Sequence, residues 1–405
     1  MSAFLAALLL ALVVVAAACG GDDDEDSGSS GSDSGGLPAE YDIGVNIALT
    51  GPIAPYDKPA LDGFRMAVEE INEKGGIGGK SRINLMIEND RSDAAESAKV
   101  SQGFVSEGVD FMVAPGDSSV AIPAARIAQQ AEIPIMSILA STTTIRQAVG
   151  EYFFSNAASD SLVATGLAKY ALDEGIDTAY TLIGPDAAFT QKLPEYFEVA
   201  FKDLGGEIVG SDTYRSGTQD FGPQVAAIRK ANPQPKAIMT SMYEPEFPAF
   251  LKQLRAAGVD LPLLESDAID TPATLELGEL IDGTIAVTYG FPTPGDSLDK
   301  FYQRFEEHYG EPPPAVFPAI GYDAASIIAD AVERAGTADP AAVRDAIEGT
   351  EKFDGVVGVT TFGTSLEGFP IRPVTIQQWS MTDSGEVERK LLEKLSIGPE
   401  EIPPP

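Results

Sequence analysis

After its N-terminal region, the chain alternates between short apolar runs and longer stretches whose apolar residues recur at helical spacing. One such stretch places Leu61, Phe64 and Val68 on a single helical face. We expect this helix to have Pro59 in its first turn and to stop at Gly75. Strands that alternate with helices of about 10–15 residues predict parallel sheets covered on both faces.

The expected strands form two successive runs. They lie at 41–49, 82–90, 109–115, 133–138, 178–184, 207–214, 236–243, 261–266 and 283–290, with two more at 355–362 and 373–380. The alternation breaks near Tyr152–Ser159 and then restarts, so we expect two doubly wound α/β lobes. A helix-rich part follows the second run, and a proline-rich tail over 396–405 ends the chain.

The chain opens with an apolar run from Ala3 to Ala18 that holds no charged side chain. Sixteen residues are fewer than the roughly 20 that a membrane span needs, whereas they fit a secretory signal over residues 1–18. The sequence AAAC that ends the run resembles the lipobox of bacterial lipoproteins. The resemblance implies that Cys19 receives lipid and becomes the mature N-terminus. An ordinary cleaved signal followed by a leftover cysteine is the alternative.

Residues 20–36 contain six glycines, five serines and six acids. Such a composition cannot build a core, so we expect 19–36 to be the lipid-anchor cysteine and a disordered tether. A flexible, self-repelling coil of this kind would hold the folded part just outside a membrane.

The overall charge narrows the possible functions. The formal net charge is −35, from 62 acids and 27 bases, and such a surface repels nucleic acid. One cysteine and one histidine exclude an intramolecular disulfide and make a Cys-based zinc site improbable. The chain also has no Gly-x-Ser-x-Gly motif. We therefore expect no enzyme, no cofactor and no metal, although counting residues does not exclude a two-carboxylate hydrolase.

Several segments, in order, resemble the branched-chain amino-acid-binding proteins, which are type I periplasmic binding proteins. They are LTGPIAPYDKPALDGFRMAVEEINEKGGIGGK, TYRSGTQDFGPQVAAIRKANP, SMYEPEFPAFLKQLRAAG, YDAASIIADAVERAG and FDGVVGVTTF followed by VTIQQW. The resemblance implies a monomer with two lobes, three crossovers and a ligand cleft, which delivers its ligand to the permease of an ABC importer. A sensor that reports ligand occupancy to a membrane partner is the alternative.

The expected crossovers lie near Ala158, Gly290 and Glu367. They divide the chain into a first lobe of 37–158 plus 291–366 and a second lobe of 159–290 plus 367–395.

In open parallel sheets, ligands bind beyond the carboxyl ends of strands. Ser118 follows such a strand and opens a helix, whose free N–H groups suit a carboxylate. The resemblance implies that Ser118 and Ser141 bind the ligand carboxylate and that Leu139 gives a backbone contact. Plain helix capping is the alternative for Ser118.

The second lobe is expected to supply Tyr243, which the resemblance places over the ligand, and Asp267, which it pairs with the ligand ammonium. A carboxylate that faces a closed cleft needs a cation because its desolvation costs several kcal/mol. Tyr56 would line the side-chain pocket. An exposed loop acid or a helix cap is the alternative for Asp267, and a loop aromatic is the alternative for Tyr56.

The resemblance has departures at the site. Asp57 stands in place of a usual glycine, Ala188 and Phe189 in place of a usual Tyr-Gly, and Leu139 is bulkier than the usual alanine. These changes alter the shape and charge of the pocket. The ligand is expected to be an amino acid or a similar small amine, with an amide, urea or an aromatic acid as the alternatives.

Overall fold

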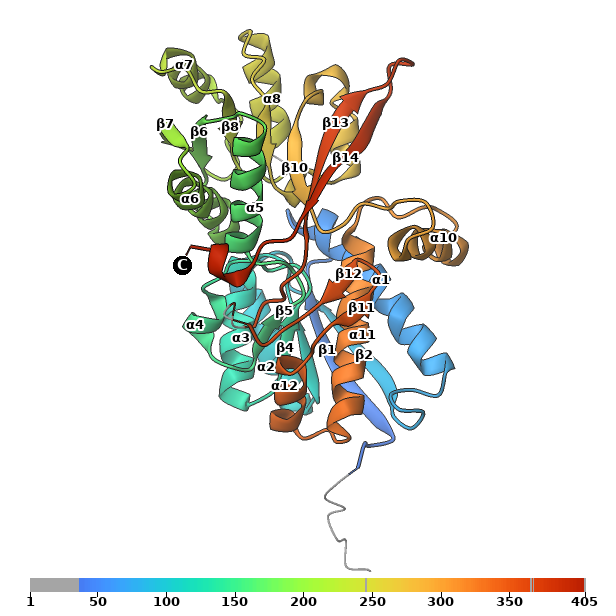
Figure 1. Ribbon diagram of the computed structural model, residues 1–405. Coiled ribbons are helices and arrows are strands. Elements are labelled where there is room, and N and C mark those ends of the chain that lie inside the picture. Colours follow the sequence, from blue (N-terminus) through green and yellow to red (C-terminus); the bar gives the residue numbers. More distant parts are fainter. Residues whose placement is uncertain (1–35, 245, 365, 367, 404–405) are drawn as a thin grey trace, which may run out of the picture. The chain divides into compact units, whose positions relative to one another are not determined.

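The computed structural model describes residues 36–403 except 245, 365 and 367 (Figure 1). The expected signal, Cys19, the tether up to residue 35 and the crossover at Glu367 lie outside the described residues. Within 36–403 and its three gaps, no helix has the length and apolar character that crossing a membrane requires.

The first sheet has five parallel strands in the order β2-β1-β3-β4-β5. They are β1 (Glu40–Ile47), β2 (Arg82–Asn89), β3 (Phe111–Ala114), β4 (Ile135–Ser137) and β5 (Phe153–Ser155). Every residue of β3, β4 and β5 is buried, as expected for parallel strands covered on both faces. The prediction of a gap at Tyr152–Ser159 was wrong, because β5 lies within it. A strand of three residues is too short to show periodicity.

Helices and one hairpin accompany this sheet to form the first lobe. They are α1 (Ala54–Glu73), α2 (Ala94–Glu107), α3 (Ser118–Ala131), α4 (Ile145–Val149), α10 (Ser297–Tyr309), α11 (Phe317–Ala335) and α12 (Pro340–Glu348), with β11 (Phe353–Gly355) and β12 (Gly358–Thr360). Helix α1 begins at Ala54 rather than near Pro59. Pro59 lies in the second turn, where the missing N–H removes only one intrahelical hydrogen bond.

The second sheet has seven strands in the order β14-β13-β10-β9-β8-β6-β7. They are β6 (Thr178–Ile183), β7 (Glu207–Thr213), β8 (Ala237–Met239), β9 (Leu263–Glu265), β10 (Ile285–Thr288), β13 (Val374–Met381) and β14 (Val387–Leu395). The first five are parallel, which confirms the predicted fold class, whereas β13 and β14 add two antiparallel strands. The sequence analysis missed β14, since this edge strand is mostly charged and only partly buried.

The helices of the second lobe are α5 (Asp160–Asp173), α6 (Ala188–Asp203), α7 (Gly222–Lys230), α8 (Phe247–Ala256) and α9 (Pro272–Leu275). The chain leaves the first sheet between β5 and α5, returns to that lobe between β10 and α10, and reaches the second sheet again at β13 (Figure 1). The lobe boundaries given above stay predictions.

Helices α1 and α11 approach closely at two glycines. A Cβ on Gly63 would lie 1.7 Å from the carbonyl oxygen of Pro318, and one on Gly321 would lie 1.8 Å from the carbonyl oxygen of Ala60. Neither distance is physically possible, so larger side chains would push the two helices apart. The first lobe therefore depends on these two glycines for its packing.

We expect Gly63→Ala to lower the free energy of unfolding by about 2 kcal/mol, because overpacking outweighs the gain in helix propensity. Urea denaturation measures the change. The matched control is Gly103→Ala in α2, where no atom lies within 4 Å of the new methyl group. This control should gain roughly 0.5–1 kcal/mol from helix propensity alone. Equal effects of the two substitutions would contradict the packing argument.

Candidate functional site

A cavity of ≈ 30 Å³ lies where the two lobes meet. Its lining comes from both lobes: Ile53, Tyr56, Gly116, Asp117, Leu139 and Phe317 from the first, and Phe189, Tyr243, Asp267 and Ala268 from the second. All of these except Phe317 follow the carboxyl end of a parallel strand, where the topology of the sheets opens a crevice. This volume holds only about one or two water molecules, so a ligand of amino-acid size would need the lobes to part before it enters.

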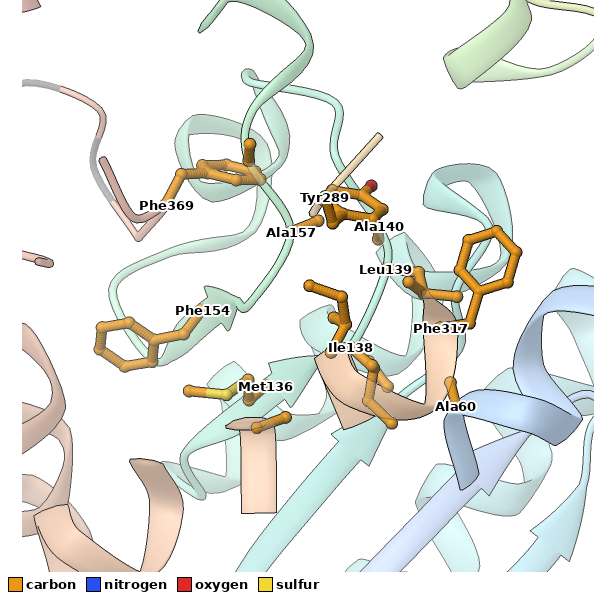
Figure 2. Close-up of a cluster of buried hydrophobic side chains, with 14 of the residues drawn as sticks. Ala60, Met136, Ile138, Leu139, Ala140, Phe154, Ala157, Tyr289, Phe317 and Phe369 are labelled. Atoms are coloured by element: carbon orange, nitrogen blue, oxygen red, sulfur yellow. The ribbon is translucent and has the colours of Figure 1, made fainter. Parts of the chain in front are cut away.

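Four of the six expected ligand-binding residues line this cavity: Tyr56, Leu139, Tyr243 and Asp267. Leu139 lies next to Phe317 at the cavity wall (Figure 2). Tyr56 lies on the first turn of α1 rather than in a loop. The binding roles of these residues stay predictions.

Ser118 lies beside the cavity but not in its lining. Its hydroxyl accepts a hydrogen bond from the Thr142 amide at 3.2 Å. Capping of α3 falls instead to Asp117, whose Oδ1 accepts from the amides of Ser119 at 2.8 Å and Val120 at 3.1 Å. The alternative that Ser118 only caps the helix was wrong, and its ligand-binding role stays a prediction. The carboxylate of Asp117 already occupies two of the amides that were expected to be free.

Ser141 is also absent from the lining, because its hydroxyl interacts with the carboxylate of Asp160. Thr142 donates to Oδ2 of the same carboxylate at 3.1 Å. Asp160 is fully buried, and burial raises its pKa to about 7 against the lowering effect of these two hydroxyls. An acid that the sequence analysis did not single out therefore lies behind the predicted carboxylate site.

Direct hydrogen bonds join the two lobes around the cavity. The Tyr243 hydroxyl donates to Oδ2 of Asp117 at 2.8 Å, and the Tyr56 hydroxyl donates to the Ala268 carbonyl at 3.1 Å. Beside them, the amide of Ala188 donates to the hydroxyl of Ser119 at 2.9 Å. The structure therefore has its cleft closed.

Asp267 is a half-buried acid in the cavity lining. Burial raises its pKa to about 7, and the negative charge of Asp270 raises it further against hydrogen bonds from its own amide and from Tyr289. No Lys, Arg or His lines the described cavity to neutralise this carboxylate. Its charged form is therefore short of a cationic partner, which a bound ligand could supply.

Sequence reasoning missed two aromatic residues of the lining and the role of Asp117. Phe189 had been noted only as a departure from the resemblance, and Phe317 had not been considered. Phe317 begins α11, far along the chain from the other lining residues, so only the fold brings it to the cavity. Asp117 lies between an expected strand and an expected helix, and an acid at this position is a typical N-cap residue, so its role could have been predicted from the sequence.

Asp57 lies against the edge of the site. Its Oδ2 accepts from the amides of Ala48 at 2.9 Å and Gly116 at 3.4 Å, and only 1% of the residue is exposed. A Cβ on Gly116 would lie 2.2 Å from Oδ1 of Asp57, so the glycine makes room for the acid. Burial raises the pKa of Asp57 to about 8 despite the two amide donors.

Asp57→Asn should make stability less dependent on pH. Between pH 4 and 8 the folded chain holds a proton on Asp57 that the unfolded chain has released, so wild-type stability falls as pH rises through this window. The loss is on the order of a few kcal/mol and should be absent in the variant. Urea denaturation at pH 5 and pH 8 measures it, with exposed Asp173→Asn as control. An unchanged pH slope in Asp57→Asn would contradict the burial argument.

Among the described residues, no group of three His, Cys, Asp or Glu side chains is arranged to hold a metal ion.

Known proteins resemble this chain in sequence and fold. The sequence model of the family described as periplasmic binding protein matches residues 40–386. A Leu/Ile/Val-binding protein homolog from Brucella suis is 25% identical over 325 residues, or 79% of this chain and 85% of that protein.

Two solved structures extend the comparison. The crystal structure of a leucine-binding protein from Thermotoga maritima is 25% identical, has a TM-score of 0.78 and aligns with 89% of this chain and 99% of its own. A solute-binding protein of an ABC transporter from Rhodopseudomonas palustris, solved in complex with benzoate, has a TM-score of 0.76 and covers 90% and 99% of the two chains. At 20% identity it supports the fold alone. With a family match over most of its length and this two-lobed fold, the chain belongs to the periplasmic binding protein family.

Proposed function

We propose that this protein is the extracytoplasmic solute-binding component of an ABC importer and captures a small amine-bearing ligand, such as an amino acid, between its lobes. The transport role is supported by a solved structure at 25% identity, which is described as an ABC transporter substrate-binding protein from Desulfitobacterium hafniense in complex with leucine. The cavity between the lobes supports capture of a small molecule. A lipid on Cys19 would keep the protein at the membrane in which the permease lies.

The choice of ligand rests on the position of Asp267 in the cavity lining. Its carboxylate lines the cavity, and no basic side chain in the described lining neutralises it. Desolvation makes an unpaired buried carboxylate costly, so a ligand ammonium would relieve that cost as it binds. An aromatic acid would instead bring a third carboxylate beside Asp267 and Asp117, which argues against the benzoate-type alternative.

Closure of the lobes gives the mechanism of capture. Tyr56 and Tyr243 reach across the cleft and hydrogen bond to the opposite lobe. Hinge closure around a ligand would engage these contacts together and trap it. The closed form would then present both lobes in the arrangement that a permease recognises.

Isothermal titration calorimetry at pH 8 tests the proposal. The panel holds the twenty amino acids, small amines, urea, amides and aromatic acids. We expect heat from at least one amine-bearing ligand and none from benzoate. Binding of benzoate with no binding of any amine-bearing ligand would reject the proposal.

Cys19→Ser should release the protein from the membrane. The wild type is expected in the membrane fraction of the producing bacterium, because two or more acyl chains anchor a protein firmly. The variant is expected in the soluble extracytoplasmic fraction, with unchanged ligand binding in solution. Immunoblotting of the fractions measures the change, and equal membrane retention of the two proteins would contradict lipid attachment at this cysteine.

A further inference from the structure

Four aromatic rings form a continuous row along the cavity, which we call the aromatic wall: Phe189, Tyr243, Tyr56 and Phe317. Phe189 stacks on Tyr243 with centroids 5.5 Å apart and an interplanar angle of 20°. Tyr243 lies 5.7 Å from Tyr56, which meets Phe317 edge-on at 5.6 Å. Aromatic faces attract cations and are used in proteins to recognise quaternary ammonium groups.

The hydroxyl groups of the aromatic wall are already used by the protein. Tyr56 donates to the Ala268 carbonyl and accepts from the Glu244 amide at 3.1 Å. Tyr243 donates to Asp117, whose carboxylate thereby has three donors in total. Among the lining side chains, these bonds leave Asp267 as the main charged acceptor for a ligand.

A primary ammonium carries three N–H donors, and each donor left unpaired in a closed site costs about 1–3 kcal/mol. A quaternary ammonium carries none and needs only negative charge and aromatic faces. The described lining holds a carboxylate, Asp267, beside the four rings of the aromatic wall, with apolar surface from Leu139 and Ile53.

The lining offers little to a ligand carboxylate. It has no Lys, Arg or His, and Asp117 occupies the first amides of α3. A carboxylate placed near this helix end would face Asp117 itself, and Asp160 lies buried behind it with its Oδ1 unpartnered in the described structure. The negative charges of a ligand carboxylate and of these two acids would repel one another in a site of low dielectric constant.

We infer that the ligand is a small quaternary ammonium cation without a carboxylate, held over the aromatic wall with its charge toward Asp267. This inference rests on the proposed function, since it specifies the ligand of the same site. Two rings of the wall come from each lobe, so lobe closure completes the surface that the cation needs.

Calorimetry with four probes at pH 8 tests the inference. Choline is the quaternary cation, 3,3-dimethyl-1-butanol its neutral isostere, glycine betaine the quaternary zwitterion, and L-leucine the primary-ammonium zwitterion. We expect choline to bind at least tenfold more tightly than each of the other three. Tighter binding of leucine or betaine than of choline would overturn the inference and leave the proposed function standing. Binding of choline and its isostere with equal affinity would overturn it too.

If neither choline nor any amine-bearing ligand binds, the proposed function fails together with the inference. Phe189→Leu and Phe317→Leu add an independent readout, because they keep an apolar side chain but remove a ring of the aromatic wall. Each should weaken choline binding at least tenfold. Phe154→Leu, a buried ring outside the lining, is the matched control. Circular dichroism verifies folding, and unchanged choline binding in folded Phe189→Leu would overturn the role of the wall.

Discussion

Asp267→Asn is expected to weaken binding of the cationic ligand by roughly ten- to a hundredfold at pH 8. The substitution keeps the shape of the side chain and removes its negative charge, and a hydrogen bond or contact to a charged group contributes about 1.5–3 kcal/mol. The half-buried position of Asp267 in the closed cavity limits screening by solvent. Titration calorimetry with the tightest-binding amine of the panel measures the loss.

The pH dependence of ligand affinity distinguishes the effect of the charge of Asp267 from the effect of its side-chain shape. Burial raises the pKa of Asp267 to about 7, so below this pH a cation must displace a proton in order to bind. Wild-type affinity should fall by up to tenfold per pH unit below 7 and level off above it. Asp267→Asn should show a weaker slope, and exposed Asp173→Asn should match the wild type at every pH. Equal affinities of wild type and Asp267→Asn at pH 8 would refute the role of this carboxylate.

Arg389→Met is expected to lower the free energy of unfolding by about 3 kcal/mol, the largest stability effect that we predict. Arg389 on β14 forms an ion pair with Asp270, whose side chain is 2% exposed. Asp270 also accepts a hydrogen bond from the Thr288 hydroxyl at 3.1 Å. Without the guanidinium, the buried carboxylate loses its cation and retains its desolvation cost. Thermal and urea denaturation measure the change.

Two variants control this experiment. The neighbouring Lys390→Met removes an exposed lysine that pairs with Glu388 and should change stability by less than about 0.5 kcal/mol. The double variant Arg389→Met with Asp270→Asn should recover much of the loss, because it removes the unpaired charge. A loss of stability in the double variant as large as in Arg389→Met alone would show that packing, rather than charge, holds β14. Since Asp270 lies three residues after Asp267, loss of the pair should also loosen the loop that carries the site.

Several residues that line the cavity could be placed near it from the sequence, because they follow the ends of predicted strands. Tyr243 and Asp267 were singled out by the resemblance, and each follows an apolar run at the carboxyl end of a parallel strand, where ligands bind. The orientation of Ser118 was not readable in this way. Its hydroxyl turns to the Thr142 amide because Asp117, one residue earlier, caps α3. Either of these two adjacent side chains could have capped α3, and only the three-dimensional structure shows that Asp117 does so.

The sequence by itself determined the two α/β lobes, since hydrophobic periodicity and helix length are local properties that specify strands, helices and their alternation. It also supplied the excess of acids. Only the tertiary structure decided that Phe317 joins Phe189, Tyr56 and Tyr243 in one wall. The reason is physical: these rings come from three helices and one loop in two lobes, and their contacts exist only when helix packing and lobe closure have placed them together.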